Sequence, residues 1–320
     1  MIYFTPYLQL GLGALGIYLG GLYVWMGFLI LFLVLPFIEI WLKDFKFSKS
    51  LYHSTLAPFS LLMTPVALSF LIGLSLWRAS HINSFFESLG LILSVGVLMG
   101  AYAVTSAHEL VHRRDVKLRA LGVYNLMLVN FAHWGVEHVF GHHKHVATPC
   151  DPATARINET VYQHWIRNYW GGLVGAWKIS RFKFLIYWCT TLIASVAVAS
   201  IFGVRVMLIW WAISIVAILL LQTVDYIEHY GLVRSKNSEG FYMAFRSSHS
   251  WDTLSTWTNI SLFNLGLHSH HHIKATLPFP DLNGQVNARL MPFGYSVMVP
   301  LALIPWIYIP LMNKKLAEIE

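Results

Sequence analysis

The stretch EHVFGHHKHVATPCDPATAR, residues 137–156, decides how the fold of this sequence is interpreted. His138, His142 and His143 are spaced i, i+4 and i+5, so on an α-helix the first two share a face and the third lies one position round. We therefore expect three imidazoles to converge on one point. Neutral imidazole is the commonest nitrogen ligand of zinc, iron and copper. The spacing first indicates a metal site.

Comparable spacing recurs elsewhere in the chain. AHELVHRRD carries two histidines at i, i+4, LHSHHH carries three at i, i+3 and i+4, and DYIEHYGL carries one. The candidate metal ligands are His108, His112, His138, His142, His143, His229, His268, His271 and His272. Tetrahedral zinc takes about four ligands and octahedral iron about six, so this set is too large for one ion. It predicts two metals with open positions for chemistry.

The remaining histidines have no such grouping. A lone histidine in an apolar chain is usually a hydrogen-bonded core or interface residue, and we expect this role for them. They are His53, His81, His133, His145, His164, His249 and His270. Cys150 and Cys189 form no CxxC pair and suggest no disulfide framework.

The composition is typical of an integral membrane protein. Of the 320 residues, 56% are hydrophobic and 12% are charged, whereas about a quarter of the residues in a soluble domain are charged. Several apolar runs reach the roughly 20 residues that cross about 30 Å of hydrocarbon. We expect a single all-α membrane domain over residues 1–320.

Hydropathy divides the chain into six expected transmembrane helices. The apolar run 3–42 is too long for one span, and Gly20-Gly21 offers a turn, so it predicts a hairpin of two. The opening residues lack a positively charged region and a cleavage site, which favours a first span over a removable signal. The expected spans are 3–19, 22–42, 56–77, 85–107, 184–202 and 206–224.

Polar, histidine-rich regions separate and follow these spans. The first covers 108–183, in which 121–138 is apolar enough for a short helix dipping into or packing under the membrane. The second covers 225–291. The last apolar stretch, 292–311, contains four prolines, which disfavour a straight spanning helix. An interfacial or re-entrant segment is expected there.

The basic residues predict an orientation. Of the 22 lysines and arginines, only Arg78 and Arg205 fall on the face opposite the loop that carries Lys43, Lys46 and Lys49. The positive-inside rule places the face with the other 20 in the cytoplasm. All candidate ligands and both termini are expected on that side, and a bacterial inner membrane is the expected location.

In its histidine-rich segments the sequence resembles a known family, the membrane-bound alkane hydroxylases (alkane 1-monooxygenases) of the membrane fatty-acid desaturase and hydroxylase superfamily. HELVHRRD at 108–115, the stretch at 137–156 and LHSHHH at 267–272 resemble its three histidine boxes. DYIEHYGLVR at 225–234 resembles its HYG motif. The resemblance covers most of the chain from about residue 36. It implies a six-helix bundle that holds two irons at its cytoplasmic end, with the nine histidines as ligands.

The sequence departs from the family pattern in two places. The third box usually has Gln-Arg before its first histidine and Asp two residues after it, whereas this chain has Gly266, Leu267 and His270. Asp225 stands where Asn is usual. An aspartate beside ligating imidazoles would orient them or balance their charge. His270 is then a spectator, a hydrogen-bond donor to a ligand, or an additional or substitute ligand.

Ligand chemistry and the resemblance together indicate oxygen chemistry. Imidazole-rich sites without thiolates suit O₂-activating non-haem iron, which supplies redox steps that zinc cannot. Substrate, O₂, two electrons and two protons would give an alcohol and water, with a lipophilic substrate admitted from the bilayer. Carboxylates that could orient the ligands are Glu109, Glu137, Asp151, Glu228 and Asp252. Glu109 and Glu137 are favoured because each adjoins a proposed ligand.

Other functions remain open at this point. Hydroxylation of a methyl group on an aromatic ring, and oxidation of an acyl chain, fit the same pattern because pocket shape decides between them. A transporter or a metal-binding membrane protein without redox chemistry is a second class. The grouping of histidines at one membrane face disfavours it, since transport sites usually lie at the midplane on broken helices. No nucleic-acid partner is expected.

The resemblance also implies an electron donor, a small acidic rubredoxin with its reductase. The net charge of the chain is +7, and Arg113, Arg114, Lys117 and Arg119 directly follow a histidine box. These residues are expected either to set topology or to dock the donor, because complementary charge speeds association. A docking surface around Lys274 and Arg289 is the alternative.

Overall fold

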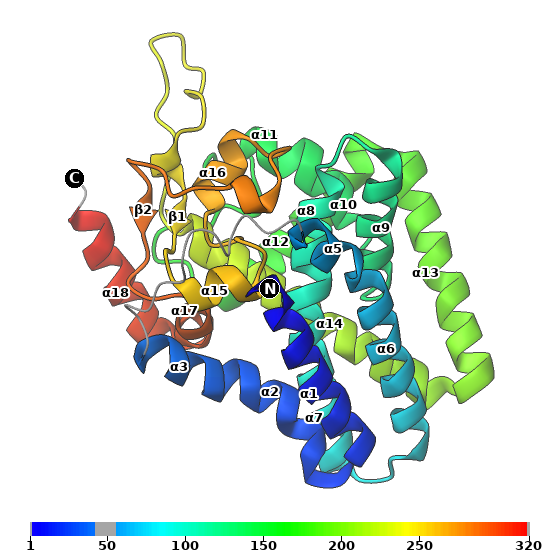
Figure 1. Ribbon diagram of the computed structural model, residues 1–320. Helices are drawn as coiled ribbons and strands as arrows, with labels where there is room; N and C mark the ends of the chain where they lie inside the picture. The colour runs from blue at the N-terminus through cyan, green and yellow to red at the C-terminus, as the bar shows by residue number, and fades with distance from the viewer. Residues whose placement is uncertain (1, 42–55, 319–320) are drawn as a thin grey trace.

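The computed structural model describes residues 2–41 and 56–318, which are mostly helical (Figure 1). Five helices in them are long and apolar enough to cross a membrane, and the protein is an integral membrane protein. These helices are Gly21–Trp41, Ala57–His81, Phe85–Val111, Arg181–Phe202 and Val204–His229.

The first three of these helices change their winding along their length, whereas the last two, α13 and α14, are continuous. Their elements are η2 (Gly21–Trp25), α2 (Met26–Leu29), η3 (Ile30–Val34), α3 (Leu35–Trp41), α5 (Ala57–Leu62), α6 (Thr64–His81), α7 (Phe85–Met99), η4 (Gly100–Val104), α8 (Thr105–Val111), α13 (Arg181–Phe202) and α14 (Val204–His229). The segments η3 and η4 are π-helical turns. A π turn holds one residue more than an α turn and therefore shifts which side chains face the bundle.

Glycines and one ion pair shape the turns at one end of the bundle. Gly20 (φ 75°) follows α1 (Thr5–Leu19), and Gly203 (φ 90°) joins α13 to α14. Both have the left-handed backbone that glycine adopts without a steric penalty. Arg78 of α6 pairs with Glu87 of α7, and the Glu87 carboxylate also accepts a hydrogen bond of 2.9 Å from the Gly21 N–H. Three helices are thereby tied together at these turns.

The other end of the bundle carries several short helices. Figure 1 shows α8, α10, α11 and α16 gathered there. These elements and the C-terminal segments are η1 (Ile2–Phe4), α9 (Val116–Met127), α10 (Trp134–Glu137), η5 (His138–His142), α11 (His143–His145), α12 (Val161–Ile179), η6 (Ser247–His249), β1 (Trp251–Asp252), α15 (Thr256–Ser261), α16 (His268–Ile273), η7 (Phe279–Asp281), β2 (Arg289–Leu290), α17 (Tyr295–Ala302) and α18 (Pro305–Ala317). The strands pair in parallel, with Trp251 opposite Arg289.

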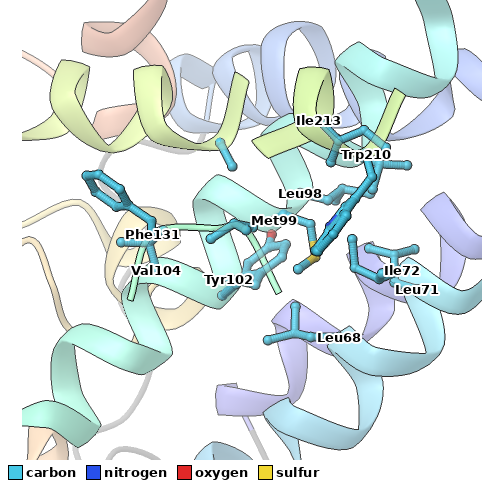
Figure 2. Close-up of a cluster of buried hydrophobic side chains, with 14 of the residues drawn as sticks. Leu68, Leu71, Ile72, Leu98, Met99, Tyr102, Val104, Phe131, Trp210 and Ile213 are labelled. Carbon is cyan, nitrogen blue, oxygen red and sulfur yellow. The ribbon is translucent and has the colours of Figure 1, made fainter. Parts of the chain in front are cut away.

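The largest apolar core lies where α6, α7 and α14 meet. Figure 2 shows side chains from these helices in contact, among them Leu68, Leu98, Met99, Trp210 and Ile213. Gly96 of α7 and Gly100 at the start of η4 bring this membrane helix close to α14, because a Cβ on either would meet α14 atoms. Small residues permit this close backbone approach, which drives helix association within a bilayer.

Glu39 fastens the first membrane helix to the C-terminal part of the chain. It is only 4% exposed although it lies on α3. Its carboxylate accepts hydrogen bonds from the hydroxyls of Ser255, Thr258 (2.7 Å) and Ser296. A buried carboxylate needs such partners, since leaving it unpaired costs several kcal/mol.

The first of the six expected spans is not among the five described helices that are long and apolar enough to cross a membrane. The segment expected to span at 3–19 forms α1, which has 15 residues. At about 1.5 Å per residue it reaches roughly 22 Å, short of the hydrocarbon thickness. The helix ends at Leu19, where the expected turn at Gly20-Gly21 begins. A role for α1 as a sixth span stays a prediction. Lys43, Lys46, Lys49 and His53 lie outside the described residues.

Other boundaries differ because polar residues continue helices beyond their apolar runs. The helices at the third and fourth expected spans reach His81 and Val111, and α14 reaches His229. The single short helix expected at 121–138 is wrong: α9 ends at Met127, and a turn with Asn130 at φ 55° separates it from α10. The tail forms α17 and α18, each too short to span, as its prolines suggest. The amphipathic α12 was not expected, and its capping box at Thr160 and Gln163 is the signal that could have found it.

Gly96→Val should destabilise the protein by about 1–3 kcal/mol, because added methyl groups would force α7 away from α14. Gly73→Val is the matched control, since a Cβ on Gly73 meets open space. Thermal unfolding in one detergent should show a lower Tm for the first variant alone. Equal Tm values for the two variants would mean that the contact between α7 and α14 accepts added volume.

Candidate metal centre

The structure brings all nine histidines with metal-ligand spacing together. They fall into two groups whose ligand atoms lie within 4.8 Å of one another in each group. The first group contains His108, His112, His138, His143 and His271, and the second contains His142, His229, His268 and His272. Ligands come from α8 and its end, η5, the start of α11, the end of α14, and α16. Segments far apart in the sequence thus supply each group.

The ring nitrogens are spaced as ligands of one ion would be. In the first group the Nε2 atom of His143 lies 3.2 Å from Nε2 of both His138 and His271. In the second group, Nε2 of His268 lies 3.2 Å from that of His229 and 2.9 Å from that of His272. Nitrogens held about 2.0–2.1 Å from a metal are separated by about 2.8–3.4 Å at octahedral or tetrahedral angles. The observed separations fit that range.

Two unpartnered nitrogens provide an independent test of the fit to a metal. Nε2 of His108 and Nε2 of His112 are buried and have no hydrogen-bond partner among the described residues. A buried polar atom without a partner costs about 1–3 kcal/mol. A metal ion within the first group would satisfy both lone pairs. The donor set, imidazole nitrogen without thiolate, suits iron, copper or zinc.

In the first group, the imidazoles outside the membrane helices are neutral and can donate a lone pair to a metal. Burial lowers the pKa of His138, His143 and His271 well below its usual value, and the neighbouring histidines lower it further. Each ring therefore keeps a lone pair at neutral pH, and no proton has to leave before a metal binds.

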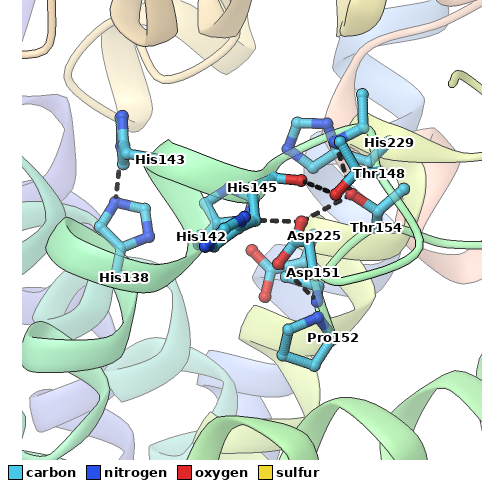
Figure 3. Close-up of polar contacts among 12 residues, drawn as sticks. His138, His142, His143, His145, Thr148, Asp151, Pro152, Thr154, Asp225 and His229 are labelled. Atoms are coloured by element: carbon cyan, nitrogen blue, oxygen red, sulfur yellow. Dashed lines mark hydrogen bonds and ion pairs between the residues drawn. The ribbon is translucent and has the colours of Figure 1, made fainter. Parts of the chain in front are cut away.

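A π-helical turn divides the second histidine box between the two groups. The spacing on an α-helix predicted that His138 and His142 share a face, and this pairing is wrong. Residues 138–142 form the π turn η5. A π turn brings i and i+5 together, so His138 joins His143 in the first group while His142 turns to the second. Figure 3 shows the contact between His138 and His143 and the separate direction of His142.

Asp151 holds His142 in one orientation. Its Oδ2 atom lies 2.9 Å from Nδ1 of His142 and accepts a hydrogen bond of 2.6 Å from the Thr154 hydroxyl (Figure 3). Burial alone would lower the pKa of His142, but the Asp151 carboxylate raises it to about 9. The contact directs Nδ1–H to Asp151 and leaves Nε2 facing His272 at 3.3 Å.

The two carboxylates favoured from the sequence occupy different surroundings. Glu109 accepts a hydrogen bond of 2.8 Å from the Phe279 N–H and pairs with Arg113. It thus ties the end of α8 to the loop after α16. Glu137 is buried against Gly175 of α12, and burial raises its pKa to about 8. Neither has a described hydrogen bond to a clustered imidazole.

Glu228 contacts a grouped imidazole directly, and Asp252 bonds the residue next to one. Oε2 of Glu228 lies 3.2 Å from Nε2 of His268, and its Oε1 accepts a hydrogen bond of 2.6 Å from the Tyr295 hydroxyl. Asp252 accepts bonds of 2.7 Å from both the N–H and the hydroxyl of Ser269, which fixes the first turn of α16. Tyr295 was not identified from the sequence, because it lies in an apolar tail with no local signal of a polar role.

An apolar pocket leads from the membrane helices to the first histidine group. It encloses about 900 Å³, part of it open to the surroundings, and His108, Asp225 and Glu228 lie on its wall. Apolar lining residues include Leu31, Phe32, Leu35, Ala101, Leu220, Val224, Leu262 and Val299. Along α14 the pocket reaches from Glu228 to Leu220, a helical rise of about 12 Å. Such a pocket accepts a slender apolar molecule with one end at the histidines.

Comparison with known proteins identifies the family. Residues 86–297 match the fatty acid desaturase family. The chain belongs to this family. It is 36% identical to alkane 1-monooxygenase 1 of Pseudomonas aeruginosa over 79% of this chain and 72% of the relative. It is 33% identical to alkane 1-monooxygenase of Acinetobacter baylyi, over 74% and 61% of the two chains. It is also 26% identical to a xylene/toluene monooxygenase hydroxylase component of Pseudomonas putida, over 94% and 85%.

Membership of this desaturase family and the named relatives make the chain an oxidoreductase, and the family and the histidine groups indicate a metal, with iron favoured.

His270 belongs to neither histidine group. Its Nδ1 accepts a hydrogen bond of 2.9 Å from the Asn283 N–H, away from the ligands. The other described ungrouped histidines are likewise outside both groups: His81, His133, His145, His164 and His249.

Asp151→Asn should weaken metal binding roughly 10–100-fold, because the amide cannot orient and polarise His142 as the carboxylate does. Asp281→Asn, an exposed aspartate in η7, is the control and should bind metal as wild type does. Competition with a chromophoric chelator measures the affinity. Unchanged affinity in Asp151→Asn would remove Asp151 from the metal centre.

Proposed function

We propose that the protein is a non-haem di-iron monooxygenase that hydroxylates the terminal methyl group of alkanes. The observation that carries this proposal is the position of two histidine groups, of five and four residues, at the end of an apolar pocket. The alkane 1-monooxygenases among the relatives support both the substrate class and the use of O₂.

The two histidine groups would each hold one iron, and the nine ligands are those that the spacing predicts. When bound, the irons would activate O₂ and provide the oxidising equivalents for insertion of one oxygen atom into a C–H bond. The full reaction consumes alkane, O₂, two electrons and two protons, and it yields alcohol and water. Five imidazoles in one group and four in the other leave room on an octahedral ion for oxygen.

The pocket would select and place the substrate. Its apolar wall binds a hydrocarbon chain without polar contacts to satisfy, and its only described carboxylates, Asp225 and Glu228, lie at the end nearest the histidines. A chain that enters from the membrane helices therefore presents its terminal carbon to His108. The same wall excludes water from the reacting carbon.

Polar residues at the inner end would position the ligands and protons. Glu228 accepts a hydrogen bond from the Tyr295 hydroxyl, and its other carboxylate oxygen lies 3.2 Å from Nε2 of His268, so it places a carboxylate between the pocket and the second histidine group. Asp225 accepts a hydrogen bond of 3.1 Å from the amide of Asn168. This contact keeps Asp225 pointing to α12.

We further propose a rubredoxin-type donor with its reductase and a cytoplasmic location of the centre in a bacterial inner membrane. The family resemblance supports the donor, and the distribution of 20 of the 22 basic residues on one face supports the orientation.

Purified protein should contain about two irons per chain, and His138→Ala or His271→Ala should lower iron content and abolish turnover, because each removes a ligand of the first group. His81→Ala is the control, since His81 is exposed at the end of α6 and outside both groups. Metal analysis by mass spectrometry gives the stoichiometry. One iron per chain, or full activity with zinc alone, would contradict the two-iron centre.

Reductant, O₂ and a series of n-alkanes should yield 1-alkanols, and Leu220→Trp should shift the preference to shorter chains, because the indole fills the far end of the pocket. Leu208→Trp is the matched control, because Leu208 lies on the same helix, is 57% exposed and does not line the pocket. Gas chromatography of competing substrates, with p-xylene included, measures both effects. A preference for p-xylene, or equal profiles in the two variants, would contradict this assignment of the pocket.

A further inference from the structure

Phe245 connects the protein surface to the second histidine group. Its ring centroid lies 5.0 Å from that of His272, with 36° between the ring planes, and 5.7 Å from that of His249. Phe245 and His272 are both partly exposed. An aromatic ring in contact with a metal ligand shortens the gap that an electron must cross from outside the protein.

Two guanidinium groups whose charges act on His249 have hydrogen-bond donors without a partner among the described residues. The Arg234 guanidinium lies over Phe245, with Cζ 5.6 Å from the ring centroid, and the residue is only 9% exposed. Its Nε and Nη2 atoms have no partner among the described residues, and neither has Nε of Arg289. Buried donors without partners are costly, and carboxylates satisfy guanidinium groups in a bidentate manner. Because these donor atoms are themselves buried, the two guanidinium groups add positive charge beneath this part of the surface rather than contacts for a partner.

More positive charge surrounds the same place. Arg246 and Lys236 are exposed on a hairpin that follows Arg234 and projects from the end of the molecule beside β1 (Figure 1). Burial lowers the pKa of His249, and the charges of Arg234, Arg246 and Arg289 lower it further, which reflects how closely they surround it. We call Arg234, Lys236, Phe245, Arg246 and Arg289 the Phe245 surface.

The basic residues that follow the first histidine box are engaged differently. Arg113 pairs with Glu109 and also donates to the Thr276 carbonyl at 3.2 Å. Arg119 donates to the carbonyls of Arg113 and Arg114 at 2.9 and 2.7 Å. Their guanidinium groups already stabilise the chain itself. Among these four residues only the side chains of Arg114 and Lys117 are left for a partner.

We propose that the acidic, rubredoxin-type electron donor docks on the Phe245 surface and that its electrons reach the metal centre through Phe245 and His272. The proposal rests on the function proposed above. Each docking event transfers one electron, which oxidises the ferrous iron of the donor to ferric and reduces one ferric iron of the centre to ferrous. Two events supply the two electrons of one turnover. Carboxylates of the donor pair with the exposed Lys236 and Arg246, and the donor's metal lies over the Phe245 ring.

The test compares two double variants with the same change in charge. Lys236→Glu with Arg246→Glu alters the Phe245 surface, and Arg114→Glu with Lys117→Glu alters the other basic surface. The full-length protein in nanodiscs of neutral lipid is titrated with a recombinant acidic rubredoxin, and Kd is measured at low and high salt. We expect about a ten-fold or greater rise in Kd for the first variant at low salt and a weaker salt dependence. The second should stay within about two-fold of wild type.

Phe245→Leu separates docking from electron transfer. It keeps an apolar side chain but removes the ring, so Kd should stay near the wild-type value while anaerobic oxidation of bound, reduced rubredoxin slows at least about ten-fold. Reduction of the centre by dithionite with a small mediator bypasses docking and should be equal in wild type and all variants. Iron content serves as the control for an intact centre.

The outcomes are distinguishable. Wild type that turns over with dithionite but binds no rubredoxin would overturn the donor and, with it, this docking surface, and leave the hydroxylase assignment standing. Rubredoxin binding that only Arg114→Glu with Lys117→Glu weakens would overturn the Phe245 surface alone. The Phe245 surface would also be overturned if its charge reversal altered association with anionic lipid vesicles but not with rubredoxin. An unchanged rate of oxidation of bound rubredoxin in Phe245→Leu would overturn it as well.

Discussion

The structure depends on one constraint, that nine imidazole nitrogens from four parts of the chain meet with their lone pairs directed inward. Buried polar atoms that lack partners are unfavourable, so this arrangement needs both an ion to satisfy it and a rigid frame to hold it. The frame is the bundle: α8 and α14 end in ligands, and η5 and α16 are fixed by Asp151 and Asp252. Helix packing and metal chemistry therefore depend on each other.

The positions of the histidines could be predicted from the sequence, but their division into groups could not. Spacing at i, i+4 correctly pairs His108 with His112 in the first group. It fails at His138 and His142 because it assumes α-helical winding, and the π turn there has no residue signature of its own. In the last box, helical neighbours are divided too: His271 joins the first group, and His268 and His272 join the second. The positions of the neighbouring helices decide which group each histidine joins, and local spacing carries no such information.

The membrane helices followed hydropathy closely, whereas the residues that complete the site did not. Apolar runs end before the helices do, so α14 carries pocket residues, Glu228 and His229 on one continuous element. Tyr295 contacts Glu228 from the apolar, proline-containing tail, whose sequence gives no sign of a polar role. The contact between Tyr295 and Glu228 is tertiary, so no local sequence pattern predicts it.

The attachment of Glu39 has a consequence for biosynthesis. The first membrane helix leaves the ribosome early, yet the hydroxyls that satisfy its carboxylate belong to Ser255, Thr258 and Ser296, more than 200 residues later in the chain. Chains are made from the N-terminus at about 5–20 residues per second, so Glu39 has none of these partners for at least ten seconds or so. During that interval the helix is held by apolar contacts and by hydrogen bonds to α7, such as that from the Gly21 N–H to Glu87. The first membrane helix therefore takes its final position in the bundle in one of the last steps of assembly, after the C-terminal third of the chain has been made.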